Sequence, residues 1–463
     1  MNEKWQRLML AVFLLLALGI PAAQGASSTN FLTWDKSKDR VDADVQDWEL
    51  WTLLEHIAGE TGWHIFVEPG LPYKPSVKFK QRPSGEALRM LLGNLNFALV
   101  PQTNNPSVLY VFRTARDRAT QFIRGPLVKG RVAQAKRVPN ELIVRVKPGV
   151  DIEKLAAELG AKVVGKIPEM DAYRLQFEND EATELAKAKL AANPEVAAVE
   201  YNYYVDQPPS PFPVAGASAP QTLLTLDPPK QDGCKVVIGL VDTAVQPMTP
   251  QLEQFIKQRA SVAGDSNTET DTPLHGTSMV ATLVQGMQAA NRSSTSTSVP
   301  IISVDAFGKD PMANTFNVAN GMIKAANLGA TVINSSLGGY ADSQLLRDAV
   351  TQLANKNIPV FAAVGNDASS SQFFPAAYPQ VISVTAVDRG QLAPYANTGT
   401  TPDIGAPGTV LFPFNNQTYV SQGTSVSTAV ATGVAARLAD ANCAPWSQVI
   451  PALEKSMPVP SGH

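Results

Sequence analysis

The C-terminal half of the chain contains an acid, a base and a nucleophile in that order. Asp242 follows an apolar run, His275 lies in the segment LHGTSMVA, and Ser425 lies in SQGTSVSTA. A serine hydroxyl becomes an effective nucleophile when an imidazole takes its proton, and a carboxylate bonded to the other ring nitrogen holds the required tautomer. Of the four histidines in the chain, His275 is the only one in this half apart from the last residue. These residues indicate nucleophilic attack by Ser425 on a carbonyl carbon.

Each of the three residues follows a local pattern that would place it at the edge of a sheet. Residues 236–241 (VVIGLV) are typical of a buried parallel strand, and open α/β sheets carry their chemistry at the carboxyl ends of such strands. His275 precedes an apolar stretch that predicts a helix, and Ser425 begins a helix of small residues that extends to Ala436. A helix start supplies unpaired backbone N–H groups beside the nucleophile.

A donor for the oxyanion of the tetrahedral intermediate is also present. The predicted strand 358–364 ends at Gly365 and Asn366. The Asn366 amide would be one donor, and the backbone N–H of Ser425 would be the second. Taken singly, each of these segments is more often a turn or a helix cap. Their order along the chain is what indicates a serine endopeptidase.

Further segments resemble the subtilase family of serine peptidases over about Lys235 to Ala439. The runs NSSLGG (residues 334–339) and YANTG with DIGAPG (within residues 395–408) are similar to family segments. The resemblance implies an α/β fold, in which a subtilisin-like catalytic domain has a mostly parallel sheet. It also implies that an extended peptide substrate pairs as an added strand. The substrate-binding residues that follow from it are Ser336, Leu337, Gly338, Ala363 and Gly365.

The chain departs from the family pattern at a few small residues. Ala244, Ala281 and Ala429 stand where the family usually has two glycines and a proline. Val364 precedes Gly365 in place of the common alanine. None of these positions transfers a proton, so the prediction of a serine endopeptidase stands. A catalytically weak or inactive pseudo-protease that binds peptides in the cell envelope is the alternative.

The part of the chain before residue 231 predicts two small α+β domains. In the first, residues 30–116, strands alternate with helices at 48–60 and 84–95. This order, with ETG after the first helix and EAL in the second, resembles the short N-terminal domain of secretins and TonB-dependent receptors. The resemblance implies docking to a protein of a Gram-negative envelope. A generic α+β spacer is one alternative, and a scaffold in which this domain is the working part is another.

The second small domain, residues 138–207, has the order βαββαβ with NPEV at the start of the last strand. This pattern resembles the subtilase propeptide. The resemblance implies an inhibitor and folding chaperone of its own enzyme, whose tail at residues 203–207 lies in the active site. A permanent accessory domain is the alternative. Residues 208–230 are proline-rich and predict an extended, exposed linker in which maturation would occur. The catalytic domain is expected over residues 231–460.

The N-terminal end and the composition indicate where the protein acts. Residues 1–25 combine basic residues, an apolar core and small residues, and so predict a secretory signal peptide and a periplasmic or secreted location. No later segment is long and apolar enough to span a membrane. A formal net charge of −3 without a basic block argues against nucleic acid as a partner. The expected partners are a peptide or protein substrate, the protein's own propeptide domain, and an envelope protein docked by residues 30–116.

Metal and disulfide chemistry have weaker signals. The two cysteines, Cys234 and Cys443, could pair in an oxidising compartment, and neither has a companion at metal-ligand spacing. Residues 265–271 are polar and are expected to form a surface loop rather than an ion site. No cofactor is therefore predicted, and calcium dependence is left open.

Overall fold

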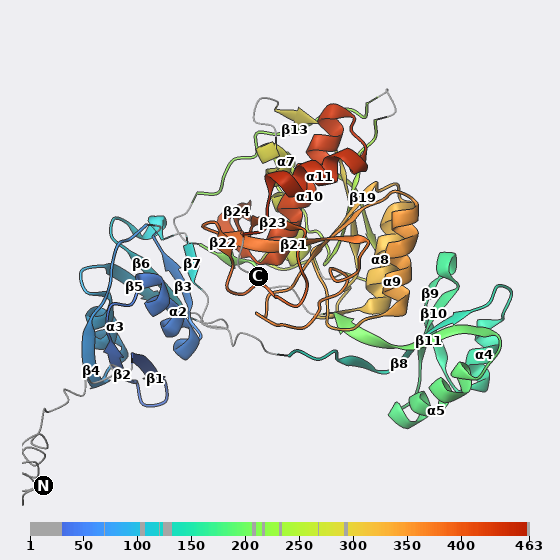
Figure 1. The fold of residues 1–463 in the computed structure, drawn as a ribbon, viewed down its shortest axis with the longest axis horizontal. Helices are drawn as coiled ribbons and strands as arrows, with labels where there is room; N and C mark the ends of the chain where they lie inside the picture. Colours follow the sequence, from blue (N-terminus) through green and yellow to red (C-terminus); the bar gives the residue numbers. More distant parts are fainter. Residues whose placement is uncertain are drawn as a thin grey trace, which may run out of the picture. The chain divides into compact units, whose positions relative to one another are not determined.

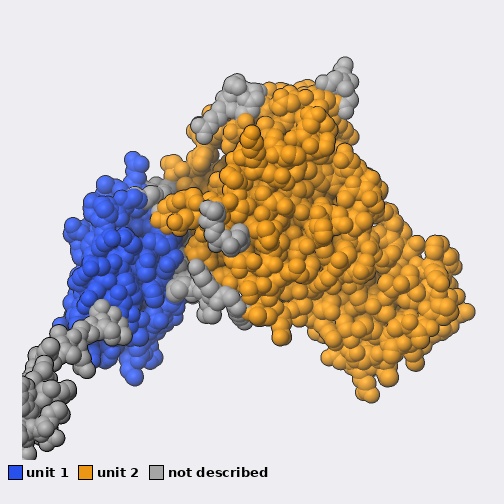
Figure 2. Space-filling model, viewed as in Figure 1, with its two compact units in different colours: residues 1–125 blue, residues 126–463 orange. Residues whose placement is uncertain are grey.

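The computed structural model describes residues 30–460 apart from 69, 102–106, 120, 124–131, 206–209, 215–217, 231–233, 267 and 291–294. The predicted signal peptide, residues 1–25, lies outside the described residues. The chain forms two compact units, residues 1–125 and residues 126–463 (Figure 2). Each unit has its own core and is described by itself.

Among its described residues, the first unit has two sheets and two α-helices around one apolar core. One sheet has the order β1-β2-β4 and the other the order β5-β6-β3-β7. On the first helix, Leu53, Leu54 and Ile57 are wholly buried, at the spacing of one helical face. The predicted alternation of strands and helices is present, although the sequence pattern predicts neither β1 nor β7. The elements are β1 (Phe31–Asp35), β2 (Arg40–Val45), α2 (Leu50–Thr61), β3 (His64–Val67), β4 (Val77–Arg82), α3 (Ser84–Leu92), β5 (Asn96–Val100), β6 (Val108–Phe112) and β7 (Gln121–Ile123).

The second unit begins with an antiparallel sheet whose strands are arranged β11-β8-β10-β9. Leu142 and Val144 of β8 belong to a buried cluster shared with the two helices of this part. Ile143 between them points to the opposite face and belongs to a cluster with Phe316, farther along the chain. The order βαββαβ is as predicted. The elements are β8 (Arg137–Val146), α4 (Ile152–Glu158), β9 (Lys162–Ile167), β10 (Ala172–Gln176), α5 (Asp180–Ala191) and β11 (Val196–Val205).

The rest of the second unit is an α/β domain with a mostly parallel sheet, as predicted (Figure 1). Its strands follow the order β15-β17-β14-β19-β20-β21-β22, with β23 paired to β21. The strands are β14 (Ile238–Asp242), β15 (Ile256–Ser261), β17 (Ile301–Asp305), β19 (Val332–Ser335), β20 (Val360–Ala363), β21 (Val381–Asp388), β22 (Gln391–Leu392) and β23 (Ile404–Pro407). The longer helices are α7 (His275–Ala290), α8 (Thr315–Asn327), α9 (Gln344–Asn355), α10 (Thr424–Asn442) and α11 (Trp446–Ser456).

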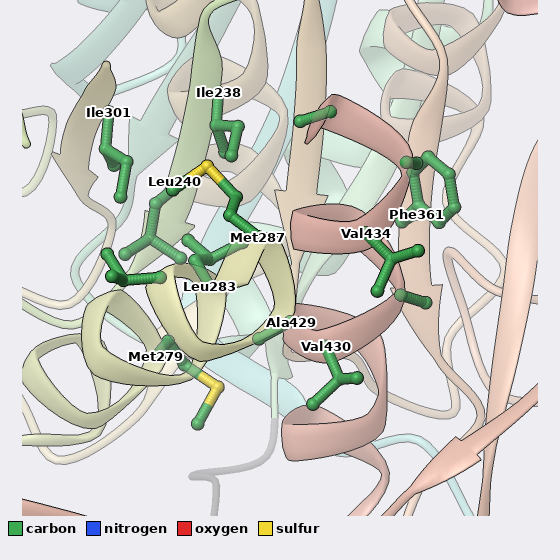
Figure 3. Close-up of a cluster of buried hydrophobic side chains, with 14 of the residues drawn as sticks. Ile238, Leu240, Met279, Leu283, Met287, Ile301, Phe361, Ala429, Val430 and Val434 are labelled. Carbon is green, nitrogen blue, oxygen red and sulfur yellow. The ribbon is translucent and has the colours of Figure 1, made fainter. Parts of the chain in front are cut away.

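Helices cover both faces of this sheet, and β14 shows how. Ile238 and Leu240 pack against side chains of α7 and α10 on one face (Figure 3). Val241 points to the other face, where it belongs to the cluster formed with α8 and α9. A strand buried on both faces reads as a continuous apolar run, which is the pattern of residues 236–241.

The backbones of α7 and α10 touch through two glycines. A Cβ atom on Gly433 would lie 2.3 Å from the carbonyl oxygen of Leu283, and one on Gly286 would lie 2.6 Å from a carbonyl oxygen of α10. Neither position has room for a side chain. Because α7 begins at His275 and Ser425 is the second residue of α10, we expect this contact to affect how close these two residues lie.

The described parts of the predicted linker are extended, but they are not all exposed. Val214 is 3% exposed and Leu224 is 1% exposed. The prediction of an exposed linker is wrong at these positions, because apolar side chains there are covered by the catalytic part of the chain. Short strand pairings accompany this burial: β12 (Phe212–Pro213) pairs with β25 (Gln417–Gln422), which also pairs with β24 (Thr409–Phe414), and β13 (Thr225–Leu226) pairs with β16 (Ser296–Thr297).

Two other expectations concern membranes and disulfides. None of the helices in the described part of the chain is long and apolar enough to cross a membrane. No disulfide joins Cys234 to Cys443. Cys234 is buried with its sulfur 4.0 Å from the carbonyl oxygen of Ala439, whereas Cys443 is exposed.

Candidate active site

Asp242 and His275 are in direct contact. Asp242 is the last residue of β14 and wholly buried, and His275 is the first residue of α7 and 5% exposed. The Nδ1 atom of His275 lies 2.7 Å from Oδ1 of Asp242, which also accepts the N–H of Thr243 at 2.7 Å. The other oxygen, Oδ2, is buried and has no hydrogen-bond partner among the described residues. The carboxylate charge is therefore directed at the imidazole through Oδ1.

The start of α7 is held against the end of β14. The N–H of Gly276 donates to the Thr243 hydroxyl at 2.8 Å. A Cβ atom on Gly276 would lie 2.2 Å from the carbonyl oxygen of Thr243, so only glycine allows this approach. The contact brings the histidine within reach of the carboxylate.

A second buried carboxyl group lies beside this pair. Asp305 ends β17 and pairs in register with Asp242 across the two parallel strands. It accepts the N–H groups of Phe307 and Gly308 at 2.8 and 3.0 Å and the hydroxyl of Ser266. Burial raises the pKa of Asp305, and the neighbouring charge of Asp242 raises it further.

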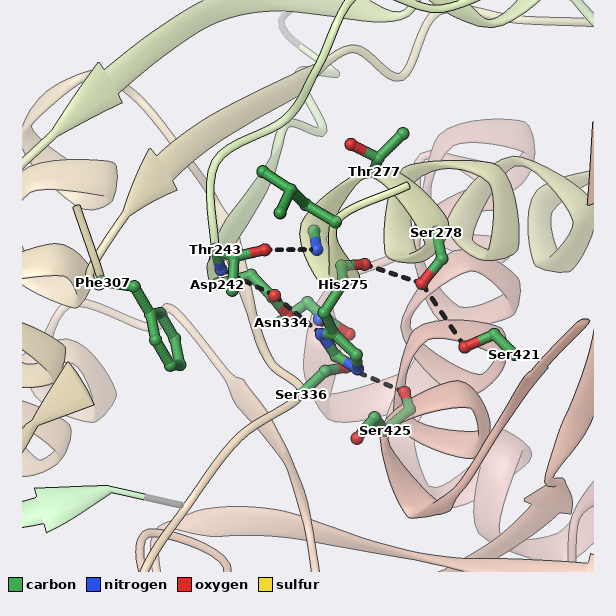
Figure 4. Close-up of polar contacts among 12 residues, drawn as sticks. Asp242, Thr243, His275, Thr277, Ser278, Phe307, Asn334, Ser336, Ser421 and Ser425 are labelled. Carbon is green, nitrogen blue, oxygen red and sulfur yellow. Dashed lines mark hydrogen bonds and ion pairs between the residues drawn. The ribbon is translucent and has the colours of Figure 1, made fainter. Parts of the chain in front are cut away.

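Ser425 is 3% exposed and is fixed from the sheet. The Ser336 hydroxyl donates to the carbonyl oxygen of Ser425 at 2.9 Å, and the Asn334 amide donates to that hydroxyl at 2.9 Å. In Figure 4 the His275 ring is drawn between Asp242 and Ser425. Within the described residues no hydrogen bond joins His275 to Ser425. Such catalytic bonds often tighten only when substrate binds.

Asn366 follows β20 with its amide turned towards the start of α10. Its Oδ1 accepts the N–H of Thr424 at 2.8 Å and the Thr424 hydroxyl at 3.1 Å. This orientation leaves the Nδ2 group available as a donor. Gly365 supports the turn with a φ of +100°, where a side chain would meet the Asn397 amide at 2.1 Å.

The predicted substrate-binding segment lies beside the chain's own β11. Leu337 is 3% exposed and clusters with Val205, the last residue of β11. The carbonyl oxygen of Tyr204 lies 3.1 Å from the position that a Gly339 Cβ would take. On their other side, Tyr204 and Val205 pair antiparallel with β18 (Ala313–Asn314). The end of β11 therefore pairs with β18 on one side and lies beside residues 337–339 on the other.

Comparison with known proteins shows the family of two parts of the chain. Residues 233–455 match the model of the subtilase family, and residues 125–202 match the fervidolysin N-terminal prodomain. The thermophilic serine proteinase of Bacillus sp. (strain AK1) is 31% identical over 326 residues, which are 65% of this chain and 78% of that protein. This chain belongs to the subtilase family. Thermitase of Thermoactinomyces vulgaris is 30% identical over 213 residues, 45% of this chain and 76% of that protein.

The solved structure of fervidolysin from Fervidobacterium pennivorans shows the same fold. It superposes with a TM-score of 0.52 and 20% identity, over 71% of this chain and 59% of that one. The protein is therefore a subtilisin-like serine endopeptidase made as a zymogen, with residues 125–202 as its prodomain region.

The prodomain region contacts helices α8 and α9, which cover one face of the sheet. Glu200 of β11 accepts the N–H groups of Gln344 and Leu345 at 2.9 and 2.8 Å, and the Ser343 hydroxyl at 3.2 Å. These groups belong to the start of α9, whose partial positive charge favours a carboxylate. Burial nevertheless raises the pKa of Glu200.

A second prodomain side chain contacts the start of α8. Asn202 accepts the Thr315 hydroxyl at 3.1 Å and the N–H of Phe316 at 3.3 Å, and it donates to Glu141 at 2.7 Å. The prodomain thus supplies partners to the N-termini of two neighbouring helices. Neither Glu200 nor Asn202 has a sequence signal beyond its place in the predicted last strand.

The sequence also gives little sign of the residues that support the site. In the sequence, Thr243 and Thr424 are only small hydroxyl residues beside the motifs, and Gln246 belongs to no motif. The polar stretch 265–271, predicted to be a surface loop, is anchored in part to Gln246. No group of three or more histidine, cysteine or acidic side chains that could hold a metal ion occurs within the described residues.

Proposed function

We propose that Asp242, His275 and Ser425 are the catalytic triad of this endopeptidase. The Ser425 hydroxyl attacks the scissile carbonyl while Nε2 of His275 takes its proton, and the imidazolium then protonates the leaving amine. Asp242 holds the imidazole through Nδ1 and stabilises its charged form. The observation that carries this assignment is the 2.7 Å contact between two buried side chains, one at the end of β14 and the other at the start of α7.

The oxyanion that forms on the attacked carbonyl would be bound by Asn366 and by the N–H of Ser425. Asn366 suits this role because Oδ1 is engaged by Thr424, which leaves Nδ2 available as a donor. Donors held in place before the reaction stabilise the developing charge without reorganisation.

The substrate would bind as an extended peptide between β18 and residues 336–339. The chain's own Tyr204 and Val205 pair antiparallel with β18 and lie beside Leu337 and Gly339, which supports an added-strand mode of binding. We assign substrate contacts to Ser336, Leu337 and Gly338, with Ala363 and Gly365 at the end of β20 completing the set. No resident metal or cofactor is part of this mechanism.

Labelling with a fluorophosphonate tests the triad directly. Wild type should be labelled at Ser425, and Ser425→Ala should not be labelled at any site. Intact mass of the secreted proteins tests self-processing at the same time, since wild type alone should lose a fragment ending between Tyr203 and Pro229. A wild-type protein that is neither labelled nor processed would be a peptide-binding pseudo-protease, as the substitutions at Ala244 and Ala429 suggest.

We also propose that the protein acts in the periplasm or is secreted, after removal of residues 1–25. Its first domain, residues 30–116, would dock to an envelope protein, as its resemblance to the short N-terminal domain of secretins and TonB-dependent receptors suggests. The two sheets of this unit, with helices between strands of each, support that resemblance. N-terminal sequencing and cell fractionation test the location. Deletion of residues 30–116 should release the protein from its envelope partner without loss of peptidase activity.

A further inference from the structure

Gln246 is a buried side chain that lies four residues after Asp242 and is 1% exposed. Its Nε2 group faces three backbone carbonyl oxygens of the segment 268–272, at 3.1 to 3.4 Å, and the Thr270 hydroxyl oxygen at 3.0 Å. Two N–H groups are shared among these four oxygens. One side chain thus holds residues 268–272 in place by hydrogen bonds, although they form no helix or strand.

The oxygen of the same amide contacts both sides of His275. Oε1 of Gln246 accepts the N–H of Leu274 at 2.7 Å and the hydroxyl of Thr277 at 3.1 Å. The backbone N–H of Gln246 donates to the same hydroxyl at 2.9 Å. The residue before His275 and the residue two after it are therefore both tied to Gln246.

These contacts connect the acid and the base through the backbone. Gln246 follows Asp242 closely on the chain that leaves β14, so its position is fixed by the same strand end. The segment 268–274 before His275 is also anchored by the Tyr419 hydroxyl, which donates to the Asp271 carbonyl oxygen at 3.4 Å. Without Gln246, the orientation of His275 would depend on the ring itself and on three more contacts. These are the Gly276 N–H, the Tyr419 hydroxyl, and the Ser278 hydroxyl that donates to the His275 carbonyl oxygen at 2.7 Å.

We propose that Gln246 is a positioning residue for His275, acting together with Thr277. This inference rests on the proposed role of His275 as the catalytic base. Gln246 does not touch substrate; it fixes the backbone on both sides of His275, so that the 2.7 Å contact with Asp242 is kept while the ring exchanges a proton. Its loss would allow the ring to move away from the geometry needed for reaction, and a shift of about 1 Å can cost about 100-fold in rate.

Gln246→Met tests the proposal, because methionine has a similar volume and removes every side-chain hydrogen bond. Thr277→Val is the second variant and removes the shared hydroxyl. The matched control is Gln285→Met. Gln285 lies on the same helix, α7, away from the site, and its amide donates to the Leu411 carbonyl oxygen at 2.8 Å. We expect kcat of Gln246→Met to fall by about 10- to 100-fold with KM changed little.

A spectroscopic readout separates positioning from general destabilisation. In the Ser425→Ala background, the low-field proton resonance of the His275 Nδ1–H group should broaden or move upfield in Gln246→Met and Thr277→Val. It should stay in place in Gln285→Met, whose thermal midpoint falls without a change in kcat.

The outcomes distinguish this proposal from the assignment of the triad. If wild type fails to label at Ser425 with a fluorophosphonate, the triad and the positioning role both fall. If wild type labels but folded Gln246→Met and Thr277→Val keep the wild-type kcat and resonance, only the positioning role is overturned. Should Gln246→Met not fold, the same two measurements on Thr277→Val decide the question.

Discussion

Replacing Gly433 with alanine tests whether the contact between α7 and α10 sets the geometry of the active site. The new Cβ would lie 2.3 Å from the carbonyl oxygen of Leu283 and 3.0 Å from the N atom of Met287. A carbon normally approaches such an oxygen to about 3.3 Å. The two helices must therefore separate by about 1 Å at this point, because the obstructing atoms are backbone.

The displacement would reach the proposed catalytic residues along rigid helices. Gly433 is eight residues after Ser425 (433 − 425), and Leu283 is eight residues after His275 (283 − 275). A misplacement of about 1 Å between base and nucleophile can lower the rate by about 100-fold. Overpacking costs about 1–3 kcal/mol of stability, and alanine returns about 1 kcal/mol of helix propensity. We therefore expect the activation free energy of hydrolysis to rise by more than the free energy of unfolding falls.

The assay is hydrolysis of a chromogenic peptide together with thermal unfolding of the same samples. Gly85→Ala in α3 is the control, because nothing lies within 4 Å of its new Cβ. It should gain up to about 1 kcal/mol and leave hydrolysis unchanged. A Gly433→Ala protein with wild-type activity and stability would refute the reasoning, since it would mean that the helices can separate without moving His275 from Ser425.

Three further predictions follow from the site and the prodomain. Asn366→Leu should lower kcat for peptide hydrolysis by about 100- to 1,000-fold, as measured for such a donor in a subtilisin, with little change in KM; a smaller loss would remove Asn366 from the oxyanion site. Asp242→Asn should lower kcat by about 10,000-fold, because the amide favours the wrong tautomer of His275, and a fluorophosphonate should label Ser425 correspondingly slowly. Burial raises the pKa of Glu200, so its contribution to prodomain docking is fully present below the ordinary value of 4.5 and is lost as the pH rises through the raised value. Prodomain release, followed by the appearance of activity, should therefore slow on acidification in wild type, and Glu200→Gln should flatten that dependence.

The residues proposed for the triad could be identified in the sequence because each carries a local signal. Asp242 ends an apolar run, and His275 and Ser425 each begin a helix whose first residues are small. The parallel sheet followed from apolar runs of the kind that a strand buried on both faces requires. Such signals depend only on neighbours in the sequence, and the subtilase resemblance added the order in which the segments occur.

What could not be predicted depends on contacts between distant residues. Helix α10 extends to Asn442 rather than ending at Ala436, because Arg437 and Asp440 are buried and lie 3.3 Å apart as an ion pair. Polar residues at such positions normally indicate an exposed helix end. The burial of Val214 in the linker could not be predicted for the same reason, and neither could the contacts of Gln246. Their partners lie in other parts of the chain and follow no repeating sequence pattern.

The contacts of Glu200 and Asn202 have a consequence for the lifetime of the mature enzyme. Helices α8 and α9 are the crossovers that connect parallel strands, and the N–H groups of Gln344 and Leu345 find their acceptor in a domain that maturation would remove. Parallel pairing of distant strands is slow to form, and after cleavage it would have to form without those acceptors. A mature molecule that opens would then be digested by its neighbours before it could refold. Its durability would be set by the height of the unfolding barrier, and half-life at a given temperature would describe it better than a free energy of unfolding.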